Sequence, residues 1–133
     1  MSEEKKIKVV LLEPGKLART AEIGTSIEDL QNAVDGLIEP FYPFEEQVCI
    51  VCNDEGKING MLPNRSVKNK DGVMVDFIFG PAFIGDCRGE SFDSLSDEQI
   101  ARYTKMFRYP EHLARLNGKL IGIPFNPQRE HER

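Results

Sequence analysis

Two cysteines three positions apart, Cys49 and Cys52, are the first residues in this sequence whose types and spacing could do chemistry. A C-x-x-C pair performs thiol–disulfide exchange at the start of a helix, and it binds zinc when a tight turn gathers both sulfurs with two further ligands. Here the pair lies in the apolar run Gln47–Cys52, which predicts a strand, and residues three apart on a strand point to opposite faces. The other candidate metal ligands do not stand at ligand spacing: Cys87, His112 and His131. We therefore expect three structural cysteines, no metal and no cofactor.

The remaining catalytic and ligand-binding motifs are incomplete. Asn69–Gly72 is similar to the middle of a calcium loop, but Ile78 stands where the closing glutamate is needed. Gly80 and Gly85 have the spacing of a phosphate-binding loop, but Asp86 follows in place of the lysine. Neither G-x-G-x-x-G nor G-x-S-x-G occurs, and two histidines leave little for acid–base chemistry near neutral pH. Because the 22 acidic residues single out no carboxylate pair, we expect no catalytic residue and no enzymatic activity.

Charge is unevenly distributed along the chain, whose formal net charge is −5. Residues 1–100 carry ten basic and 19 acidic side chains, whereas residues 101–133 carry seven basic and three acidic ones. The positive charge gathers at five positions: Arg102, Lys105, Arg108, Arg115 and Lys119. These residues form either a docking patch for an acidic ligand or partner or the polar face of a helix with bases at its negative end. Five charges on an acidic chain are too few for direct binding to duplex nucleic acid.

The elements that must position these residues begin with two strands. The run Ile7–Leu12 is apolar on both alternating faces, which is typical of an inner strand covered on both sides. Glu13–Lys16 predicts a type II turn with Gly15 at the position that accepts positive φ. Arg19–Ile23 predicts the return strand of this hairpin.

Two capping boxes predict two helices. The first, Thr25–Glu28, precedes an apolar stripe and predicts a helix over Ile27–Asp35 that ends at a left-handed Gly36. The second box, Ser96–Gln99, opens a helix with acidic residues in its first turn, where the helix dipole favours them. Its buried stripe is predicted to consist of Ile100, Tyr103, Thr104 and Phe107.

The middle of the chain predicts further strands: Leu37–Phe41 as an edge strand with prolines, Gln47–Cys52, Val73–Phe79 and Ala82–Gly85. Asn53–Lys57 predicts a hairpin turn with Gly56 at positive φ. Ile58–Leu62 then forms a short strand or a single turn. The polar segment Pro63–Gly72 predicts a loop.

The last third of the chain follows Pro110, which stops the second helix or starts another. Glu111–Leu116 predicts that next helical turn, ended by Asn117 and Gly118. Lys119–Phe125 is a short apolar run.

The fold class we expect is α+β, a single domain with one mainly antiparallel mixed sheet, two covering helices in the order β-β-α-β-β-β-α, and a C-terminal extension. The domain spans residues 1–125, with an extension over 109–125, and residues 126–133 form a flexible charged tail. The expected core is Ile7, Val9, Leu11, Ile23, Leu30, Val34, Val48, Ile50, Val75, Phe77, Ile100 and Phe107.

Composition bounds the cellular setting. No apolar run approaches the roughly 20 residues that cross a bilayer, the charged start Met1–Lys6 is not a secretory signal, and three cysteines cannot build a disulfide framework. We expect a cytoplasmic protein with no membrane partner, a monomer or weak homodimer.

An ordered set of short motifs resembles a small family catalogued as the domain of unknown function 3846, over about residues 6–108. The motifs are Ile7-Lys-Val-Val-Leu-Leu-Glu-Pro-Gly-Lys16, Cys49-Ile-Val-Cys-Asn-Asp-Glu-Gly-Lys57, Leu62-Pro-Asn-Arg65, Ile78-Phe-Gly80 and Ser94-Leu-Ser-Asp-Glu-Gln-Ile-Ala-Arg-Tyr103. The resemblance implies a small protein of bacterial plasmids, integrative elements or phages, and it implies no known activity.

The function we expect is a non-enzymatic accessory or binding protein of a mobile genetic element, with an unknown protein or a small anionic ligand as partner. The candidate binding residues are Asn64, Arg65, Lys68, Arg102 and Lys105. Arg65 offers a bidentate fork for phosphate or carboxylate, and its structural alternative is a guanidinium held by a local acid or by loop carbonyls.

Three alternatives remain open. A counter-defence protein would block a host protein or sequester a nucleotide signal. Sequestration needs Arg65, Lys68 or Lys70 converging with an aromatic ring for stacking, supplied by Phe41, Tyr42 or Phe44. A small carboxylate-dependent hydrolase needs two converging carboxylates, and a homo-oligomeric module would pair the edge near Leu37–Phe44 with its copy.

Overall fold

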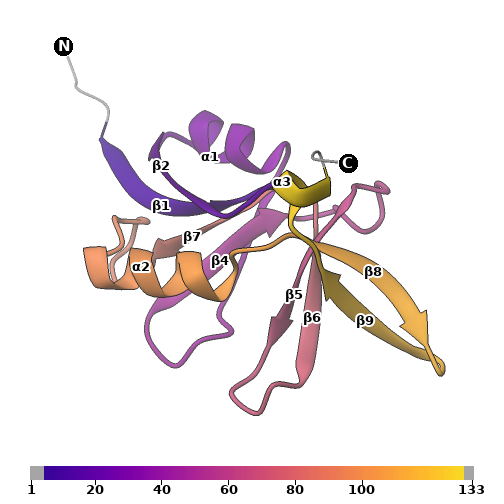
Figure 1. Ribbon diagram of the computed structural model, residues 1–133. Coiled ribbons are helices and arrows are strands. Elements are labelled where there is room, and N and C mark those ends of the chain that lie inside the picture. Colours follow the sequence, from indigo (N-terminus) through magenta and orange to yellow (C-terminus); the bar gives the residue numbers. More distant parts are fainter. Residues whose placement is uncertain (1–4, 131–133) are drawn as a thin grey trace.

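The computed structural model describes residues 5–130, and its centre is a five-stranded sheet in the order β2-β1-β7-β4-β3 with every neighbouring pair antiparallel (Figure 1). Its strands are β1 (Lys6–Leu12), β2 (Arg19–Gly24), β3 (Ile38–Phe41), β4 (Val48–Asn53) and β7 (Ala82–Asp86). Two antiparallel pairs stand apart from it: β5 (Pro63–Lys68) with β6 (Met74–Phe79), and β8 (Glu111–Leu116) with β9 (Lys119–Pro124). The helices are α1 (Ile27–Val34), α2 (Asp97–Met106) and α3 (Pro127–Glu130).

The α+β class and the mainly antiparallel pairing are confirmed, but the single expected sheet is instead one large sheet and two hairpins. The chain order is β1-β2-α1-β3-β4-β5-β6-β7-α2-β8-β9-α3, so the expected order is incomplete. β7 lies between β1 and β4, far from both in sequence. Because that insertion depends on contacts between distant segments, local sequence patterns do not predict it.

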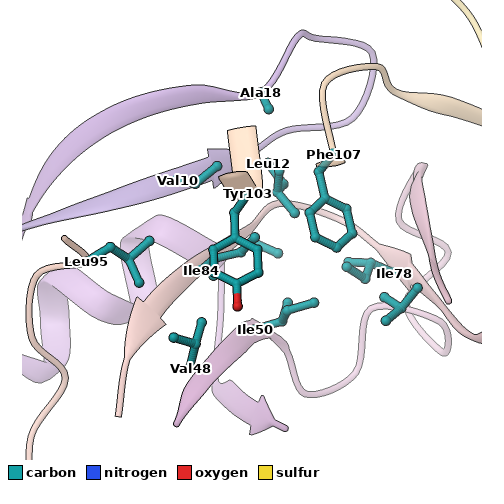
Figure 2. Packing of buried hydrophobic residues seen from close by; sticks show 12 residues of the cluster. Val10, Leu12, Ala18, Val48, Ile50, Ile78, Ile84, Leu95, Tyr103 and Phe107 are labelled. Atoms are coloured by element: carbon teal, nitrogen blue, oxygen red, sulfur yellow. The ribbon is translucent and has the colours of Figure 1, made fainter. Parts of the chain in front are cut away.

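The two faces of the large sheet bury separate cores. Ile7 and Val9 of β1 pack with Leu30 and Val34 of α1, while Val10 points to the other face. On that second face, Tyr103 and Phe107 reach from α2 and its C-terminal end toward the sheet (Figure 2). Val67 and Ile78 of the β5–β6 hairpin join the same cluster. The second face is therefore covered by α2 and the β5–β6 hairpin together. The prediction of two covering helices did not include this hairpin.

The helices begin where local hydroxyl groups cap them. Ser26, not Thr25, caps α1, because the Ser26 hydroxyl accepts from the Asp29 N–H. The left-handed residue that ends α1 is Asp35 at φ 61°, one position before the predicted Gly36. The box that opens α2 is confirmed: the Ser96 hydroxyl accepts from the Gln99 N–H and the Gln99 side chain accepts from the Ser96 N–H.

The predicted loop over 63–72 is wrong, because its first six residues form strand β5. Asn64, Arg65 and Ser66 are polar yet buried, so the strand lacks the apolar alternation that would reveal it. The hairpin predicted over Asn53–Lys57 is also wrong, because β4 pairs with β3 and β7 and the chain then leaves for β5. Gly56 is required there by a close approach instead: a Cβ atom at this position would lie 2.5 Å from the Phe79 carbonyl oxygen.

The helical turn predicted over Glu111–Leu116 is wrong as well, because this segment is β8 and pairs in register with β9. Asn117 and Gly118 join the two strands at φ 52° and 79°, and positive φ at both central residues is the requirement of a type I′ hairpin turn. In the expected tail, residues 127–130 form α3, and residues 131–133 lie outside the described range.

Nine of the twelve expected core residues are buried, and Ile23 and Ile100 are half-buried. Val75 is 56 % exposed, and placing it in the core was wrong. It lies on β6 of a two-stranded sheet, which leaves part of its surface uncovered. β3 is an edge strand carrying Pro40, as expected. Across residues 5–130, none of the helices has the length and apolar character that crossing a bilayer would require.

Candidate functional site

A cleft of about 830 Å³ opens between α2, the loop over residues 42–47 and the β5–β6 hairpin. Its apolar floor consists of Phe44, Tyr103, Met106 and Phe107. The Phe44 ring packs 4.7 Å from Tyr103 and 6.3 Å from Phe107, measured between centroids. Tyr103 and Phe107 also belong to the core, so the floor is held rigidly, whereas Met106 is 55 % exposed. The volume lies within the range of about 300–1,000 Å³ that small-molecule sites occupy.

The loop that forms one wall is fastened to α2 by the carboxylate of Glu46. Its Oε1 accepts from Gln99 Nε2 at 3.0 Å and from the Tyr103 hydroxyl at 2.8 Å, and its Oε2 accepts from Arg102 Nη1 at 3.0 Å. Desolvation raises the pKa of Glu46, but the hydrogen bonds from Arg102, Tyr103 and Gln99 outweigh it and leave the pKa below its ordinary value. Burial, followed by the hydrogen bond to Glu46, raises the pKa of Tyr103. Glu46 is thus an ionised structural clamp and a poor general base.

The opposite rim of the cleft is positively charged. Lys68 and Lys70 are exposed there, and neither forms an ion pair or side-chain hydrogen bond with any residue in 5–130. Arg102 also lines the cleft, but its guanidinium is engaged by Glu46 and lies 3.9 Å from Glu98. Glu111 closes one end, where its Oε1 accepts from the Ser66 N–H at 3.1 Å and the Ser66 hydroxyl at 2.7 Å. Lys68 and Lys70 are therefore the cations available to a ligand.

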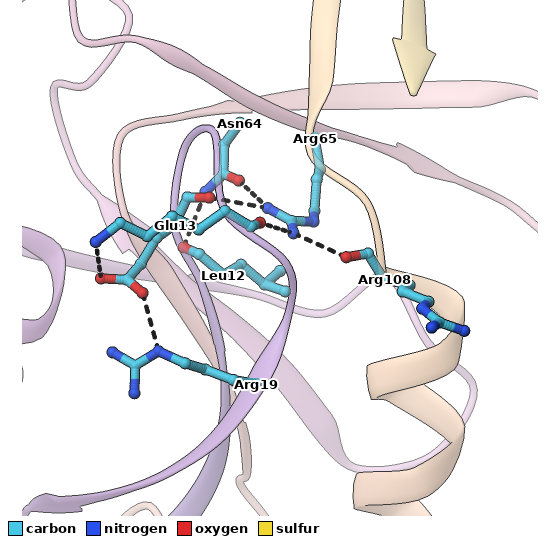
Figure 3. A network of polar contacts seen from close by, with 7 residues as sticks. Leu12, Glu13, Arg19, Asn64, Arg65 and Arg108 are labelled. Atoms are coloured by element: carbon cyan, nitrogen blue, oxygen red, sulfur yellow. Dashed lines mark hydrogen bonds and ion pairs between the residues drawn. The ribbon is translucent and has the colours of Figure 1, made fainter. Parts of the chain in front are cut away.

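Arg65, which precedes the cleft residue Ser66 on β5, is fully buried. Figure 3 shows its guanidinium beside Asn64 and the Arg108 carbonyl. Its guanidinium donates to the carbonyl oxygens of Phe107 at 2.6 Å, Lys16 at 2.6 Å and Glu13 at 3.2 Å. A longer contact of 3.4 Å reaches the Arg108 carbonyl. Burial lowers the pKa of Arg65 to about 10, against the opposing charges of Glu111 and Glu13, so the group stays charged at neutral pH. Of the two roles considered for Arg65, ligand binding and a structural role, this geometry is the structural one, because main-chain carbonyls hold the guanidinium.

Asn64 completes the buried network. Its side-chain oxygen accepts from Arg65, and its Nδ2 donates to the carbonyl oxygens of Leu12 at 3.0 Å and Gly80 at 2.8 Å. Neither Asn64 nor Arg65 is accessible to a ligand. Their predicted place in an exposed loop was wrong, because a polar strand satisfied by main-chain carbonyls has the composition of a loop.

The five predicted binding residues therefore separate into three places. Lys68 and Arg102 share the cleft, and Asn64 and Arg65 are buried on β5. Lys105 lies in a different groove beside α2. Of the aromatic rings considered for stacking, Phe44 lines the cleft. Glu46 and Met106 were not among the predicted site residues. A carboxylate that binds a helix more than 50 residues away leaves no local pattern in the sequence.

The cysteines lie where strand alternation places them. Cys49 packs in the core under α1 and Cys52 packs against the core of the opposite face, so their sulfurs diverge. Burial is the main cause that raises the pKa of both thiols, with Cys87 adding to the shift at Cys49, and the pKa of Cys52 reaches about 11. Both thiols are therefore protonated at neutral pH, which disfavours exchange chemistry. His131 falls outside the described residues.

Comparison with known proteins gives one match. A family model described as "Domain of unknown function (DUF3846)" matches residues 7–108, from β1 to just after α2. A search of curated proteins and a search of solved structures each returned no match. The matched range includes the cleft floor, the Glu46 clamp and both free lysines, whereas Glu111 and the β8–β9 hairpin lie beyond it.

Proposed function

This chain belongs to the DUF3846 family, and from that premise we propose that it is a non-enzymatic binding protein whose cleft takes up a small organic anion. One observation carries the proposal: Lys68 and Lys70, which form no ion pair with any residue in 5–130, line the cleft together with its apolar, aromatic floor. Such a cleft matches a ligand with an anionic group at one end and a flat or apolar body at the other. Because both lysines are exposed, each ion pair with the anion contributes about 0–1 kcal/mol.

A non-catalytic role is favoured by the state of the carboxylates in the cleft. Glu46 is held by three side chains of α2, and Glu111 is held by Ser66. Glu45, the third acid, is exposed at the surface. A carboxylate-dependent hydrolase needs two acids converging on one substrate position, with at least one pKa tuned toward the working pH. The low pKa of Glu46 is opposite to that requirement.

The cellular setting we propose is an accessory role in a mobile genetic element. Its narrower form, sequestration of a nucleotide signal as a counter-defence, is supported by a specific feature. Lys68 and Lys70 share the cleft with Phe44, which combines the cations and the ring that the phosphates and the base of a nucleotide require.

Isothermal titration tests the proposal with mononucleotides, cyclic dinucleotides and aryl phosphates as defined probes. We expect at least one probe to bind, and the Lys68→Gln/Lys70→Gln variant to bind it at least tenfold more weakly, a loss of about 1.4 kcal/mol. The matched control is Lys105→Gln, an exposed lysine of α2 outside the cleft, which should bind as the unmodified chain does. No binding by any probe, or an equal loss of affinity in the control variant, would contradict the proposal. If only the nucleotides fail to bind, the sequestration of a nucleotide signal would be contradicted.

A further inference from the structure

A second groove runs along the other side of α2, between this helix and the β1–β2 hairpin. It has a volume of about 510 Å³ and shares no lining residue with the cleft. Its apolar base is formed by Leu17, Ala18 and Ile100, and its charged residues are Lys105 and Arg108. Within residues 5–130, no carboxylate lines it. In a chain with 22 acidic and 17 basic residues, a groove that holds only positive charge is a distinct local feature.

The two cations of this groove are exposed, and neither forms an ion pair within residues 5–130. The Arg108 guanidinium lies over the Tyr109 ring, 5.5 Å from its centroid, a cation–π contact that leaves its N–H groups open to a carboxylate. The backbone that carries Arg108 is fixed, because its carbonyl oxygen accepts from the Ala18 N–H at 3.0 Å and from Arg65 at 3.4 Å. Lys105 in the last turn of α2 and Arg108 just beyond its C-cap both complement the negative end of the helix dipole, and both also line the groove.

The openness of the groove to solvent decides what kind of ligand it suits. Thr20, Ala101, Lys105 and Arg108, half of its lining, are exposed at the surface. A small molecule needs most of its area buried to bind tightly, and this groove would leave much of it in water. A polypeptide gains affinity from extended contact, with an apolar anchor in the base and acidic groups on the rim.

We propose that the groove between α2 and the β1–β2 hairpin docks an acidic segment of a partner protein, with an apolar side chain seated over Ala18 and Ile100 and carboxylates paired with Lys105 and Arg108. This interaction surface is separate from the cleft and does not depend on the proposed ligand. Complementary charge speeds the encounter and orients the segment, and the apolar anchor slows its release.

Peptide display on the immobilised full-length chain provides the test, with a random library of 12-residue peptides as the probe. We expect the selected sequences to combine several Asp or Glu residues with at least one large apolar residue. Fluorescence anisotropy should then show the affinity falling at least tenfold in Lys105→Glu/Arg108→Glu and weakening with added salt. The Arg108 substitution keeps the carbonyl that binds Ala18 and Arg65, and circular dichroism verifies that the variant is folded.

The matched control is Arg115→Glu/Lys119→Glu, which reverses two exposed cations of the β8–β9 hairpin outside both the groove and the cleft and should leave peptide affinity unchanged. Selection of peptides without acidic enrichment, equal loss in both variants, or no selected peptide would overturn the proposal. If a duplex DNA oligomer binds the unmodified chain and does not bind the Lys105→Glu/Arg108→Glu variant, the groove binds nucleic acid and the peptide proposal is overturned.

Discussion

Arg65 joins three segments that are distant in sequence: the turn after β1, strand β5 and the end of α2. A helix C-terminus leaves carbonyl groups without partners, and the guanidinium satisfies the one on Phe107 while its positive charge complements the helix dipole. The sequence singled out Arg65 by its type and by its place in a motif. Its burial could not be predicted, because the acceptors are main-chain carbonyls that any residue would supply.

Replacing the buried Arg65 guanidinium should lower the free energy of unfolding more than most other single substitutions in the chain. In Arg65→Met the carbonyls of Phe107, Lys16 and Glu13 lose their donor, and each unsatisfied buried acceptor costs about 1–3 kcal/mol. We expect urea denaturation to show a loss of about 3–5 kcal/mol in the free energy of unfolding, and Arg65→Lys to recover part of it.

The matched control for this change is Arg19→Met, which removes an arginine whose side chain is 56 % exposed and paired with Glu13. A surface pair contributes about 0–1 kcal/mol, so this variant should stay close to the unmodified chain. Similar losses in the two variants would show that Arg65 does not hold the three segments together.

At the scale of elements, α2 could be predicted well, whereas its neighbours could not. Its start is encoded locally by Ser96 and Gln99, and the stripe of Ile100, Tyr103 and Phe107 sets its buried face. The clamp that joins it to the β3–β4 loop depends on Glu46, which only the folded chain brings near. The same reason explains why β5 was predicted as a loop: its buried polar residues find their hydrogen-bond partners in other elements, which the local sequence does not reveal.

The Glu46 clamp makes part of the stability depend on pH. Its folded-state pKa lies below the ordinary value of 4.5, so the folded state favours the ionised carboxylate. The stabilisation is present above the unfolded-state pKa and is lost as pH falls through the lower folded-state pKa. We expect the difference in unfolding free energy between the unmodified chain and Glu46→Gln to be constant near neutral pH and to shrink in acid below about pH 4.

Urea denaturation as a function of pH checks this expectation. Glu45→Gln changes the neighbouring exposed acid, and its difference from the unmodified chain should show little change across the same range. A Glu46→Gln difference that grows in acid would mean that the carboxylate does not act as an ionised clamp.

At the scale of the whole molecule, the two hairpins beside the main sheet decide the shape of the cleft. β5 and the turn that follows it supply its basic rim, through Lys68 and Lys70, and β8 reaches its end through Glu111. A signal for the β8–β9 hairpin was present in Asn117-Gly118, the dipeptide that type I′ turns favour, but Pro110 is also typical of a helix start, and it favoured a helical turn over Glu111–Leu116. The place of β7 in the sheet had no such signal, because strand order depends on contacts between distant segments.

The two side-chain hydrogen bonds that join β5 to the β8–β9 hairpin within residues 5–130 both end on the Glu111 carboxylate. Glu111→Ala removes the acceptor for both the Ser66 N–H and the Ser66 hydroxyl. We expect hydrogen exchange to speed up by about tenfold or more at Ser66 and along β8 and β9, because an isolated two-stranded hairpin is only marginally stable. Protection of the five-stranded sheet should not change. Glu22→Ala, at an exposed glutamate of β2, is the control, and unchanged exchange at Ser66 in Glu111→Ala would mean that the hairpin is held by other contacts.

The position of β7 also has a kinetic consequence during synthesis. β1 finds its partner β2 within a few residues, and β3 finds β4 equally soon, but the strand that joins these two hairpins ends only at Asp86. Until it is translated, β1 and β4 lack the strand that will cover their inner edges, at Val10–Leu12 and Val48–Cys52. Pairing across such a separation slows folding, and bare edges recruit other chains. A ribosome that stalls before residue 82 would thus leave an aggregation-prone product. We expect chaperones to bind the nascent chain mainly before β7 has been translated.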